Sequence, residues 1–338
     1  MMKASIQIGW PPGMRPHYRP SIKIGIPSTK TFRLDDSAFN LEYTSLTGYV
    51  DGREGLMPKI PQDVLKSSFF VYEKLADAEK AINPIGTGFL IGVASKKQTI
   101  GSRFFASIFA TTNQHVVRDR CAVRIEDVCA ETKEDDWIFN STGDDFAITP
   151  IRLDHCYDTR FIPTTSFATE EFITENEIGV GDDVFMFGLY VDNQNYATGI
   201  PSARFGHISM MPHEQATAIV QNATGPTAPS IILDMHSRSG FSGSPVFVYR
   251  TPGSNLDHAN SGNLMLNEGA LFKFLGIHWG QFPEFWRRDS EDGSRDLIEG
   301  VSGMTVAIPA WRVLKFIETN PRLQDIIISN ERAIGMLE

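Results

Sequence analysis

Residues 240–245 read Gly-Phe-Ser-Gly-Ser-Pro, and this short stretch constrains the fold more than any other part of the chain. Glycines on both sides of Ser242 allow a tight turn that presents the serine hydroxyl outward. The same turn leaves the backbone N–H groups of Gly240 and Ser242 pointing at one spot, where they can stabilise a negatively charged oxygen. Small residues with serine and proline also form ordinary surface turns, so the stretch needs support from elsewhere in the sequence.

That support comes from one histidine and one aspartate upstream. A serine hydroxyl becomes a good nucleophile when an imidazole accepts its proton and a carboxylate orients that imidazole. Residues 109–117 read Phe-Ala-Thr-Thr-Asn-Gln-His-Val-Val, which places His115 just after an apolar, strand-like run. Asp145 begins the short apolar segment 145–148, Asp-Phe-Ala-Ile. The sequence therefore predicts a catalytic set of His115 as the base, Asp145 as the orienting carboxylate and Ser242 as the nucleophile.

Two of these residues have a close competitor. Asp144 precedes Asp145, and because successive side chains of a strand face opposite sides, only one of the two can reach the imidazole. The Asp-x-Ala-x pattern favours Asp145. Ser244 follows Ser242, but only Ser242 lies between the two glycines of the turn. A histidine beside apolar residues is by itself more often structural, so the prediction depends on the three residues together.

The order His, Asp, Ser in these local contexts resembles the chymotrypsin/trypsin-like serine peptidases, and especially their disulfide-free bacterial branch, similar to the high-temperature-requirement proteases. Further short matches cover residues 86–91, 181–188, 206–209, 275–280 and 304–309. The resemblance implies an all-β fold of two six-stranded antiparallel Greek-key barrels of chymotrypsin type with a C-terminal helix. It also implies a serine endopeptidase that forms an acyl-enzyme on Ser242, with the N–H groups of Gly240 and Ser242 as the oxyanion hole.

The resemblance also suggests where a substrate would bind. Residues 278–280, His-Trp-Gly, are similar to the strand along which the substrate backbone pairs in that family. His278 occupies the place of a small residue, so a bulky imidazole there would narrow the approach to the catalytic residues. His236 lies close to the position of the floor of the specificity pocket, although a loop histidine beside Arg238 is an equally good interpretation. The predicted substrate-binding residues are His236, His278, Trp279 and Gly280.

Domain boundaries follow from pattern and resemblance. Alternating apolar residues separated by turns continue to about Val306, which is typical of a β-rich sandwich or barrel. We expect an N-terminal extension of unknown role, a peptidase domain with two barrels, and a helical tail. These cover residues 1–57, residues 58–318 with barrels at about 62–155 and 176–308, and residues 319–338.

Both ends of the chain carry patterns outside the barrels. Residues 5–11, Ser-Ile-Gln-Ile-Gly-Trp-Pro, recur with small changes at 21–27, and the alternation predicts two short strands. A hairpin against the peptidase body, a flexible arm and a segment that docks a partner all fit this pattern. After Pro309 the apolar residues Trp311, Leu314 and Ile317, with Val313 as a further member, stand at helical spacing and predict a helix packed on the second barrel. Leu323, Ile326 and Ile327 continue a helical pattern in the tail.

Composition limits the partners and the compartment. The chain has 338 residues and a formal net charge of −10 without a basic run, which argues against nucleic acid. No stretch has the length of a signal peptide core or a membrane span. Three cysteines, Cys121, Cys129 and Cys156, show no Cys-x-x-Cys spacing and predict a reducing, cytoplasmic location. The eight histidines are scattered, so no metal and no cofactor are expected, and the predicted partner is a protein or peptide substrate.

Two other functions compete with peptide hydrolysis. A peptidase-like protein that has lost turnover and binds peptides or regulates a partner would share the whole pattern. An α/β-hydrolase esterase also uses a serine flanked by glycines, but it places the histidine after the serine and a helix directly behind it. Residues 245–249, Pro-Val-Phe-Val-Tyr, have a strand pattern instead, which disfavours the esterase.

Overall fold

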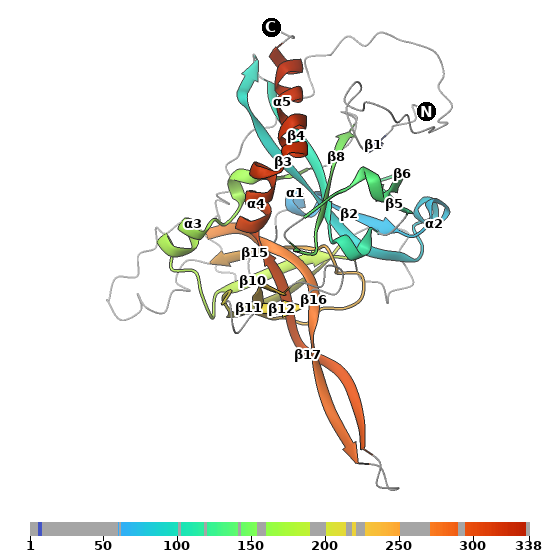
Figure 1. Ribbon diagram of the computed structural model, residues 1–338, viewed down its shortest axis with the longest axis vertical. Helices are drawn as coiled ribbons and strands as arrows, with labels where there is room; N and C mark the ends of the chain where they lie inside the picture. Colours follow the sequence, from blue (N-terminus) through green and yellow to red (C-terminus); the bar gives the residue numbers. More distant parts are fainter. Residues whose placement is uncertain are drawn as a thin grey trace.

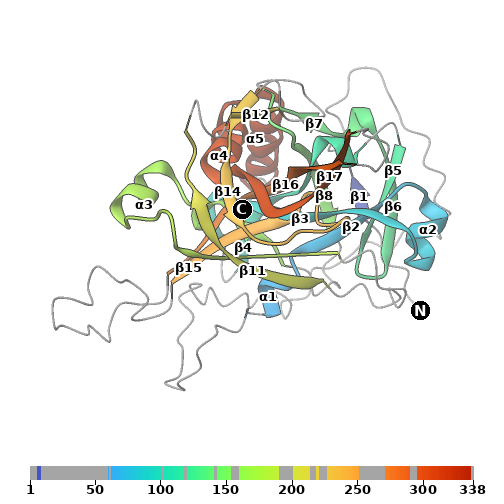
Figure 2. The same cartoon turned by 90° about the horizontal axis from the view of Figure 1, so that it is seen from below.

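A computed structural model describes most of the chain (Figure 1). The protein consists of two antiparallel β units followed by two helices. The helices α2 and α3 lie on opposite flanks of the molecule in both views (Figure 1, Figure 2). The described residues are 6–8, 60, 62–100, 103–117, 120–140, 143–153, 160–189, 201–213, 218–220, 227–250, 271–289 and 295–335.

The first unit is a nine-stranded sheet. Its strands lie in the order β1-β8-β4-β3-β2-β5-β6, with β7 paired to β8 and β9 paired to β3. The strands are β1 (Ile6–Ile8), β2 (Ser68–Tyr72), β3 (Pro84–Ile100), β4 (Arg103–Thr112), β5 (Arg120–Ile125), β6 (Val128–Lys133), β7 (Ile138–Phe139), β8 (Ala147–Leu153) and β9 (Ile162–Pro163). Only the β3–β9 pair is parallel among these described strands. The predicted antiparallel β unit is confirmed, but its strand path is open and contains more than six strands.

One strand of this sheet comes from the N-terminal extension. The segment Ile6–Ile8 forms β1 and pairs antiparallel with β8, with Ile6 opposite Leu153 and Ile8 opposite Ile151. The strand predicted in residues 5–11 therefore exists and extends the first sheet. The repeat at 21–27 lies outside the described residues.

The second unit is a closed six-stranded barrel in the order β10-β11-β14-β17-β16-β15, as the sequence predicted. Its strands are β10 (Asp183–Gly188), β11 (Ser202–Met210), β14 (Ile231–Asp234), β15 (Pro245–Arg250), β16 (Leu271–Asp289) and β17 (Arg295–Pro309). A separate pair, β12 (Ala218–Val220) and β13 (Thr227–Pro229), lies outside the ring. The hairpin of β16 and β17 continues well beyond the barrel, as far as the pair Asp289 and Arg295 (Figure 1).

Alternation along the strands explains how both faces of a strand are buried. In β10, Val184 and Met186 contribute to the cluster inside the barrel, whereas Phe185 and Phe187 contribute to a second cluster on the opposite face. Successive side chains of a strand point to opposite faces, so an unbroken apolar run fills two cores at once.

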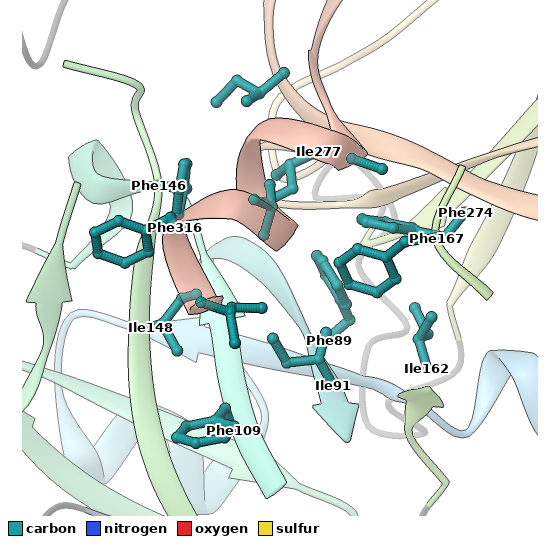
Figure 3. Packing of buried hydrophobic residues seen from close by; sticks show 14 of the residues in the cluster. Phe89, Ile91, Phe109, Phe146, Ile148, Ile162, Phe167, Phe274, Ile277 and Phe316 are labelled. Carbon is teal, nitrogen blue, oxygen red and sulfur yellow. The ribbon is translucent and has the colours of Figure 1, made fainter. Parts of the chain in front are cut away.

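That second cluster joins the two units (Figure 3). Phe274 of the barrel lies 5.3 Å from Phe89 of the first sheet and 4.5 Å from Phe167, measured between ring centroids. Each buried aromatic side chain of this kind contributes roughly 1.5–3 kcal/mol through the area it removes from water. The shared core fixes one unit against the other.

Short helices connect the strands, and two longer ones end the described chain. The helices are α1 (Gln62–Leu65), α2 (Leu75–Lys80), α3 (Glu170–Glu175), α4 (Ala310–Thr319) and α5 (Pro321–Gly335), with single 3₁₀ turns η1 (Gln114–Val116), η2 (Glu134–Asp136) and η3 (Thr164–Ser166). No helix in the described part of the chain is long and apolar enough to cross a membrane.

The predicted helix after Pro309 exists as α4, but its buried face is wider than the predicted stripe. Val313 and Ile317 are buried and belong to the shared core. Phe316, which the stripe omitted, is buried as well and meets Phe146 of the first unit edge-on at 5.2 Å (Figure 3). The helix therefore packs between the two units and not on the second barrel alone.

The tail forms α5 and is part of the same core. Its predicted apolar residues Leu323, Ile326 and Ile327 are all buried in the shared cluster. Asn330 donates a hydrogen bond to the Ser107 hydroxyl of β4 at 3.0 Å. The tail thus packs against the first sheet.

Candidate active site

His115 lies in the short turn that follows β4. The strand ends at Thr112, and His115 lies in η1. The two residues that follow it, Val116 and Val117, are buried in the core of the first unit and anchor the turn. Its side chain is 26% exposed, which leaves one edge of the ring open to solvent. The apolar pair after the histidine therefore fixes the loop from which the imidazole projects.

Asp145, two residues before the start of β8, holds this imidazole. Its Oδ2 lies 2.5 Å from Nδ1 of His115, and its Oδ1 accepts a hydrogen bond from the His115 backbone N–H at 3.0 Å. The side-chain amide of Asn113 donates to the Asp145 carbonyl at 2.7 Å. A carboxylate accepts but does not donate when ionised, so Nδ1 carries the proton and Nε2 of the neutral ring carries the lone pair that a base needs.

The neighbouring Asp144 faces the other way. Its Oδ1 lies 2.9 Å from Nη2 of Arg312 in α4, and its Oδ2 accepts a hydrogen bond from the Asn140 side-chain amide at 3.1 Å. Both aspartate side chains are buried. The geometry thus pairs His115 with Asp145, whereas Asp144 ties the loop to α4.

Ser242 lies in a tight turn at the edge of the second barrel. Gly240 and Gly243 have φ angles of 95° and 84°, which side chains with a Cβ rarely adopt. Within the turn, the Phe241 N–H donates to the Arg238 carbonyl and the Ser244 N–H donates to the Phe241 carbonyl. The Phe241 side chain is completely buried in the barrel, whereas Ser242 is half-buried. The predicted need for glycine at both positions is therefore a real backbone requirement.

Thr87 of β3 docks this turn onto the first unit. Its N–H donates to the Ser242 carbonyl at 2.9 Å, and its hydroxyl donates to the Gly240 carbonyl at 2.7 Å. The same hydroxyl accepts a hydrogen bond from the Leu189 N–H at 2.8 Å, and the Thr87 carbonyl accepts one from the Thr112 hydroxyl. One threonine thus ties the serine turn to the strand that leads to His115.

The turn also approaches the histidine loop closely. A Cβ added to Gly243 would lie 2.1 Å from the Thr87 carbonyl oxygen, 2.4 Å from the Thr112 hydroxyl and 3.2 Å from the Asn113 nitrogen. Only a residue without a side chain fits here. The structure therefore brings the turn of Ser242 against the residues that immediately precede His115.

One contact of the predicted set is not formed. The Ser242 hydroxyl makes no hydrogen bond to any residue in the described part of the chain, His115 included. Likewise, no described residue accepts a hydrogen bond from the backbone N–H groups of Gly240 and Ser242, whereas the carbonyls of both residues are occupied. Catalytic hydrogen bonds are often long without substrate and shorten when the substrate binds.

The predicted substrate-binding residues have different surroundings. His236 is exposed and lies beside Gly303, whose added Cβ would be 3.0 Å from the His236 ring. A Cβ added to Gly280 would meet no atom within 4 Å, so space is open there. Trp279 is 8% exposed and follows the buried His278 on β16. The structure brings His278 to the serine turn but places its imidazole in the interior, and substrate contacts at all four residues stay predictions.

His278 has the most perturbed titration near the site. Burial lowers its pKa to about 4, a hydrogen bond with the Phe241 carbonyl opposes this shift, and the charge of nearby His115 adds to it. Its Nε2 is buried without a hydrogen-bond partner among the described residues. The ring is therefore neutral over the physiological pH range.

The roles of Thr87 and Arg312 were missed by sequence analysis. Thr87 stands in the Gly-Thr-Gly segment 86–88, which was noted only as a strand. The available signal was its position between two glycines, because its hydroxyl is the one side-chain group in this segment that can form a hydrogen bond. Nothing local to Arg312 indicates its partner, because 168 residues of chain separate it from Asp144.

No protein-family model matches the chain, and no curated protein matches it. Among solved structures, the inactive form of the Rv3671c protease from M. tuberculosis is similar, with 16% sequence identity over 76% of this chain and 90% of that chain and a TM-score of 0.41. Human heparin binding protein is similar with 10% identity over 78% of this chain and 96% of that chain, at a TM-score of 0.41.

The fold is of the chymotrypsin type. The closed six-stranded barrel, the antiparallel sheet unit before it and the helix after it carry this assignment. In this chymotrypsin-type fold, His115 and Asp145 come from the first unit and Ser242 from the second. In the described part of the chain, no group of three or more histidine, cysteine, aspartate or glutamate residues could hold a metal ion.

Proposed function

We propose that the protein is a serine endopeptidase of the chymotrypsin/trypsin-like class. The observation that carries the proposal is the 2.5 Å contact between His115 Nδ1 and Asp145 Oδ2, next to a serine turn that Thr87 ties to the same loop. A buried carboxylate bonded to both the ring and the backbone of one histidine is the arrangement that general-base catalysis on a serine needs.

The reaction has two halves. Ser242 Oγ forms a bond to the peptide carbonyl carbon while its proton moves to His115 Nε2, and the N–H groups of Gly240 and Ser242 donate to the developing oxyanion. The C–N bond then breaks, and the leaving amine takes the proton from His115. In the second half, water gives a proton to His115 while its oxygen bonds to the acyl carbon. The bond between that carbon and Ser242 Oγ then breaks, Oγ takes the proton back from His115, and the carboxylic acid product leaves. Asp145 stabilises the imidazolium in both halves.

The second candidate is a fold that binds peptides without turnover. It is favoured by the absence of a hydrogen bond between Ser242 Oγ and His115 in the described structure. The esterase alternative has less support, because Ser242 is followed by strand β15 and not by a helix.

Labelling with a fluorophosphonate distinguishes these candidates, since the probe reacts only with an activated serine. The wild-type protein should be labelled at Ser242, located by mass spectrometry of the digested protein. The Ser242→Ala variant should be unlabelled and should lose peptidase activity by roughly 10⁶-fold. Absence of labelling in the folded wild-type protein would instead support the silent alternative.

Ser244→Ala is the matched control for this experiment. The Ser244 hydroxyl is buried two residues from Ser242 and has no hydrogen-bond partner among the described residues. Its removal should leave both labelling and turnover close to the wild-type level. Equal loss in both variants would show that the turn, and not the Ser242 hydroxyl, was disturbed.

The finer assignments belong to this proposal. Cys121 and Cys129 are free, and Cys156 lies outside the described residues. Burial raises the pKa of the Cys121 thiol to about 11, so it is unreactive at neutral pH. The free thiols support a disulfide-free peptidase in a cytoplasmic, reducing compartment that acts on protein or peptide substrates. Alkylation under denaturing, non-reducing conditions tests this, and all three cysteines are expected to react as free thiols.

A further inference from the structure

His278 is hydrogen-bonded to three residues around the candidate nucleophile. Its backbone N–H donates to the Ser244 carbonyl at 2.9 Å, and its carbonyl accepts from the Gly243 N–H at 2.9 Å. Its ring nitrogen Nδ1 lies 3.1 Å from the Phe241 carbonyl oxygen. The main chain and side chain of this one residue therefore contact the residues on both sides of Ser242.

The contact with Phe241 fixes the protonation of the ring. A carbonyl oxygen only accepts hydrogen bonds, so Nδ1 carries the proton and Nε2 of the neutral ring carries a lone pair. Burial keeps the ring neutral by lowering the pKa of His278 to about 4. His278 thus donates one hydrogen bond, and its target is the Phe241 carbonyl.

That carbonyl belongs to the peptide unit whose N–H is on Ser242. The described part of the chain contains no cis peptide bond, so the C=O of Phe241 and the N–H of Ser242 point in opposite directions. Two donors hold the carbonyl on the interior side, namely the Ser244 N–H at 2.9 Å and His278 Nδ1 at 3.1 Å. The Ser242 N–H consequently points away from the interior, and no described residue accepts a hydrogen bond from it.

Stability alone does not explain a histidine at this position. The imidazole is 2% exposed, and its Nε2 has no hydrogen-bond partner among the described residues. A buried acceptor without a donor costs roughly 1–3 kcal/mol, and an apolar side chain of similar size would avoid that cost. The one favourable polar contact of the ring is the bond to Phe241.

We propose that His278 is a positioning residue that locks the Phe241–Ser242 peptide plane, so that the Ser242 N–H faces the oxyanion of the reacting substrate. The proposal rests on the proposed peptidase function. It assigns the imidazole to the interior support of the oxyanion hole, in place of the substrate-binding position at the approach to the catalytic residues that the sequence suggested. Without the ring, the Ser244 N–H alone holds the carbonyl, and the peptide plane can rotate.

The test compares two replacements of His278. His278→Asn places an amide donor near the position of Nδ1. His278→Leu has a side chain that branches at the same carbon atom as asparagine but carries no hydrogen-bond donor. The measured quantities are the rate constant for fluorophosphonate labelling of Ser242 and, with a peptide substrate cleaved by the wild type, kcat and KM separately. Loss of one oxyanion donor lowers kcat by roughly 10²–10³-fold, and the Leu variant should approach this loss with KM nearly unchanged. The Asn variant should recover most of the rate.

Folding is checked by thermal unfolding of each variant. If the Leu variant does not fold, His278→Ala is the second variant without a donor and should show the same loss of kcat. A folded Leu or Ala variant that is labelled as fast as the wild type overturns the proposal. Equal losses in the Asn and Leu variants also overturn it, because the donor would then be irrelevant. Failure of the wild type to label at Ser242 is a different result, which contradicts the peptidase function itself.

Discussion

The two sides of the candidate site are held by different kinds of contact. On the histidine side, His115 and Asp145 belong to one β unit, and the Asp145 carboxylate contacts the His115 ring at 2.5 Å and accepts a hydrogen bond from the His115 backbone N–H at 3.0 Å. On the serine side, the turn is held through its backbone carbonyls by Thr87 of the first unit and His278 of the second. The acid–base pair is therefore local to one unit, whereas the nucleophile depends on how the two units dock.

Among the residues that hold the nucleophile and the base in place, Asp145 should give the largest effect on activity when it is replaced. Asp145→Asn keeps the shape of the side chain but presents an amide, which favours the wrong tautomer of His115. We expect kcat to fall by roughly 10⁴-fold. Steady-state kinetics with a peptide substrate measure this loss.

Asp144→Asn is the matched control one residue away. Asp144 pairs with Arg312 and not with His115, so its neutralisation should lower the free energy of unfolding by about 3 kcal/mol, as for a broken buried ion pair. Activity of the folded protein should stay within about tenfold of the wild type, since the contact between Asp145 and His115 is left in place. A larger loss of kcat in Asp144→Asn than in Asp145→Asn would reverse the assignment of the two carboxylates.

Gly243→Ala tests the close docking of the serine turn. The added methyl would lie 2.1 Å from the Thr87 carbonyl at a φ of 84°, so both sterics and backbone conformation oppose it. We expect a loss of about 3 kcal/mol or more in the free energy of unfolding. Activity should fall by roughly 10²-fold, because the oxyanion donors move with the turn.

Gly179→Ala provides the control for this substitution. Its added methyl meets no atom within 4 Å. Urea unfolding should show a change within about 0.5 kcal/mol. If both alanine variants were equally stable, the docking of the turn against β3 would be looser than described.

Thr87→Val tests the connection between the units. It removes the hydroxyl that donates to Gly240 and accepts from Leu189, leaving two buried backbone groups without a partner. We expect a loss of about 3 kcal/mol in the free energy of unfolding. Denaturant unfolding measures this loss, and a smaller decrease in kcat should accompany it.

Thr111→Val is the matched replacement in the adjacent strand. The Thr111 hydroxyl is fully buried and has no hydrogen-bond partner among the described residues. Valine there should be neutral or stabilising. Similar destabilisation by the two valines would argue that packing, and not the hydrogen bonds of Thr87, matters.

The smallest expected effect is the pH dependence that His278 contributes. Burial lowers the pKa of His278 from 6.5 to about 4, so the unfolded chain binds the proton more readily than the folded protein. The stability from this residue is complete above about pH 6.5 and declines as the pH falls toward 4. At pH 5 the decline should be about 2 kcal/mol relative to pH 7.5. Urea unfolding of the wild type and of His278→Asn at both pH values isolates the contribution of His278. An equal decrease in the free energy of unfolding of the two proteins would contradict this prediction.

Some residues of the site could be predicted from local sequence. His115 follows an apolar strand and precedes two valines, and Ser242 lies between two glycines that the turn requires for its positive φ angles. Alternation indicated that only one of Asp144 and Asp145 can reach the imidazole, the Asp-x-Ala-x pattern favoured Asp145, and the contacts of the two carboxylates agree with that choice. These residues were accessible because their roles depend on neighbours a few positions away.

Other residues were not accessible in this way. The imidazole of His278 was expected at the approach to the catalytic residues, but it is buried against Phe241. Phe316 was left out of the helical stripe because its partner, Phe146, lies in the other unit. Such roles depend on which surfaces meet across the molecule, and a single sequence carries no direct signal for that.

The amino-acid sequence by itself determined the β-rich architecture and the terminal helices, and it indicated Ser242, His115 and Asp145 as the candidate catalytic residues, because strand alternation, helical spacing and glycine turns are set by local sterics. Only the tertiary structure decided what holds these residues in place: the Thr87 bridge, the ion pair of Asp144 with Arg312, and the interior position of His278. Those contacts arise when two separately patterned β units bury one common core, and their geometry exists only after that burial.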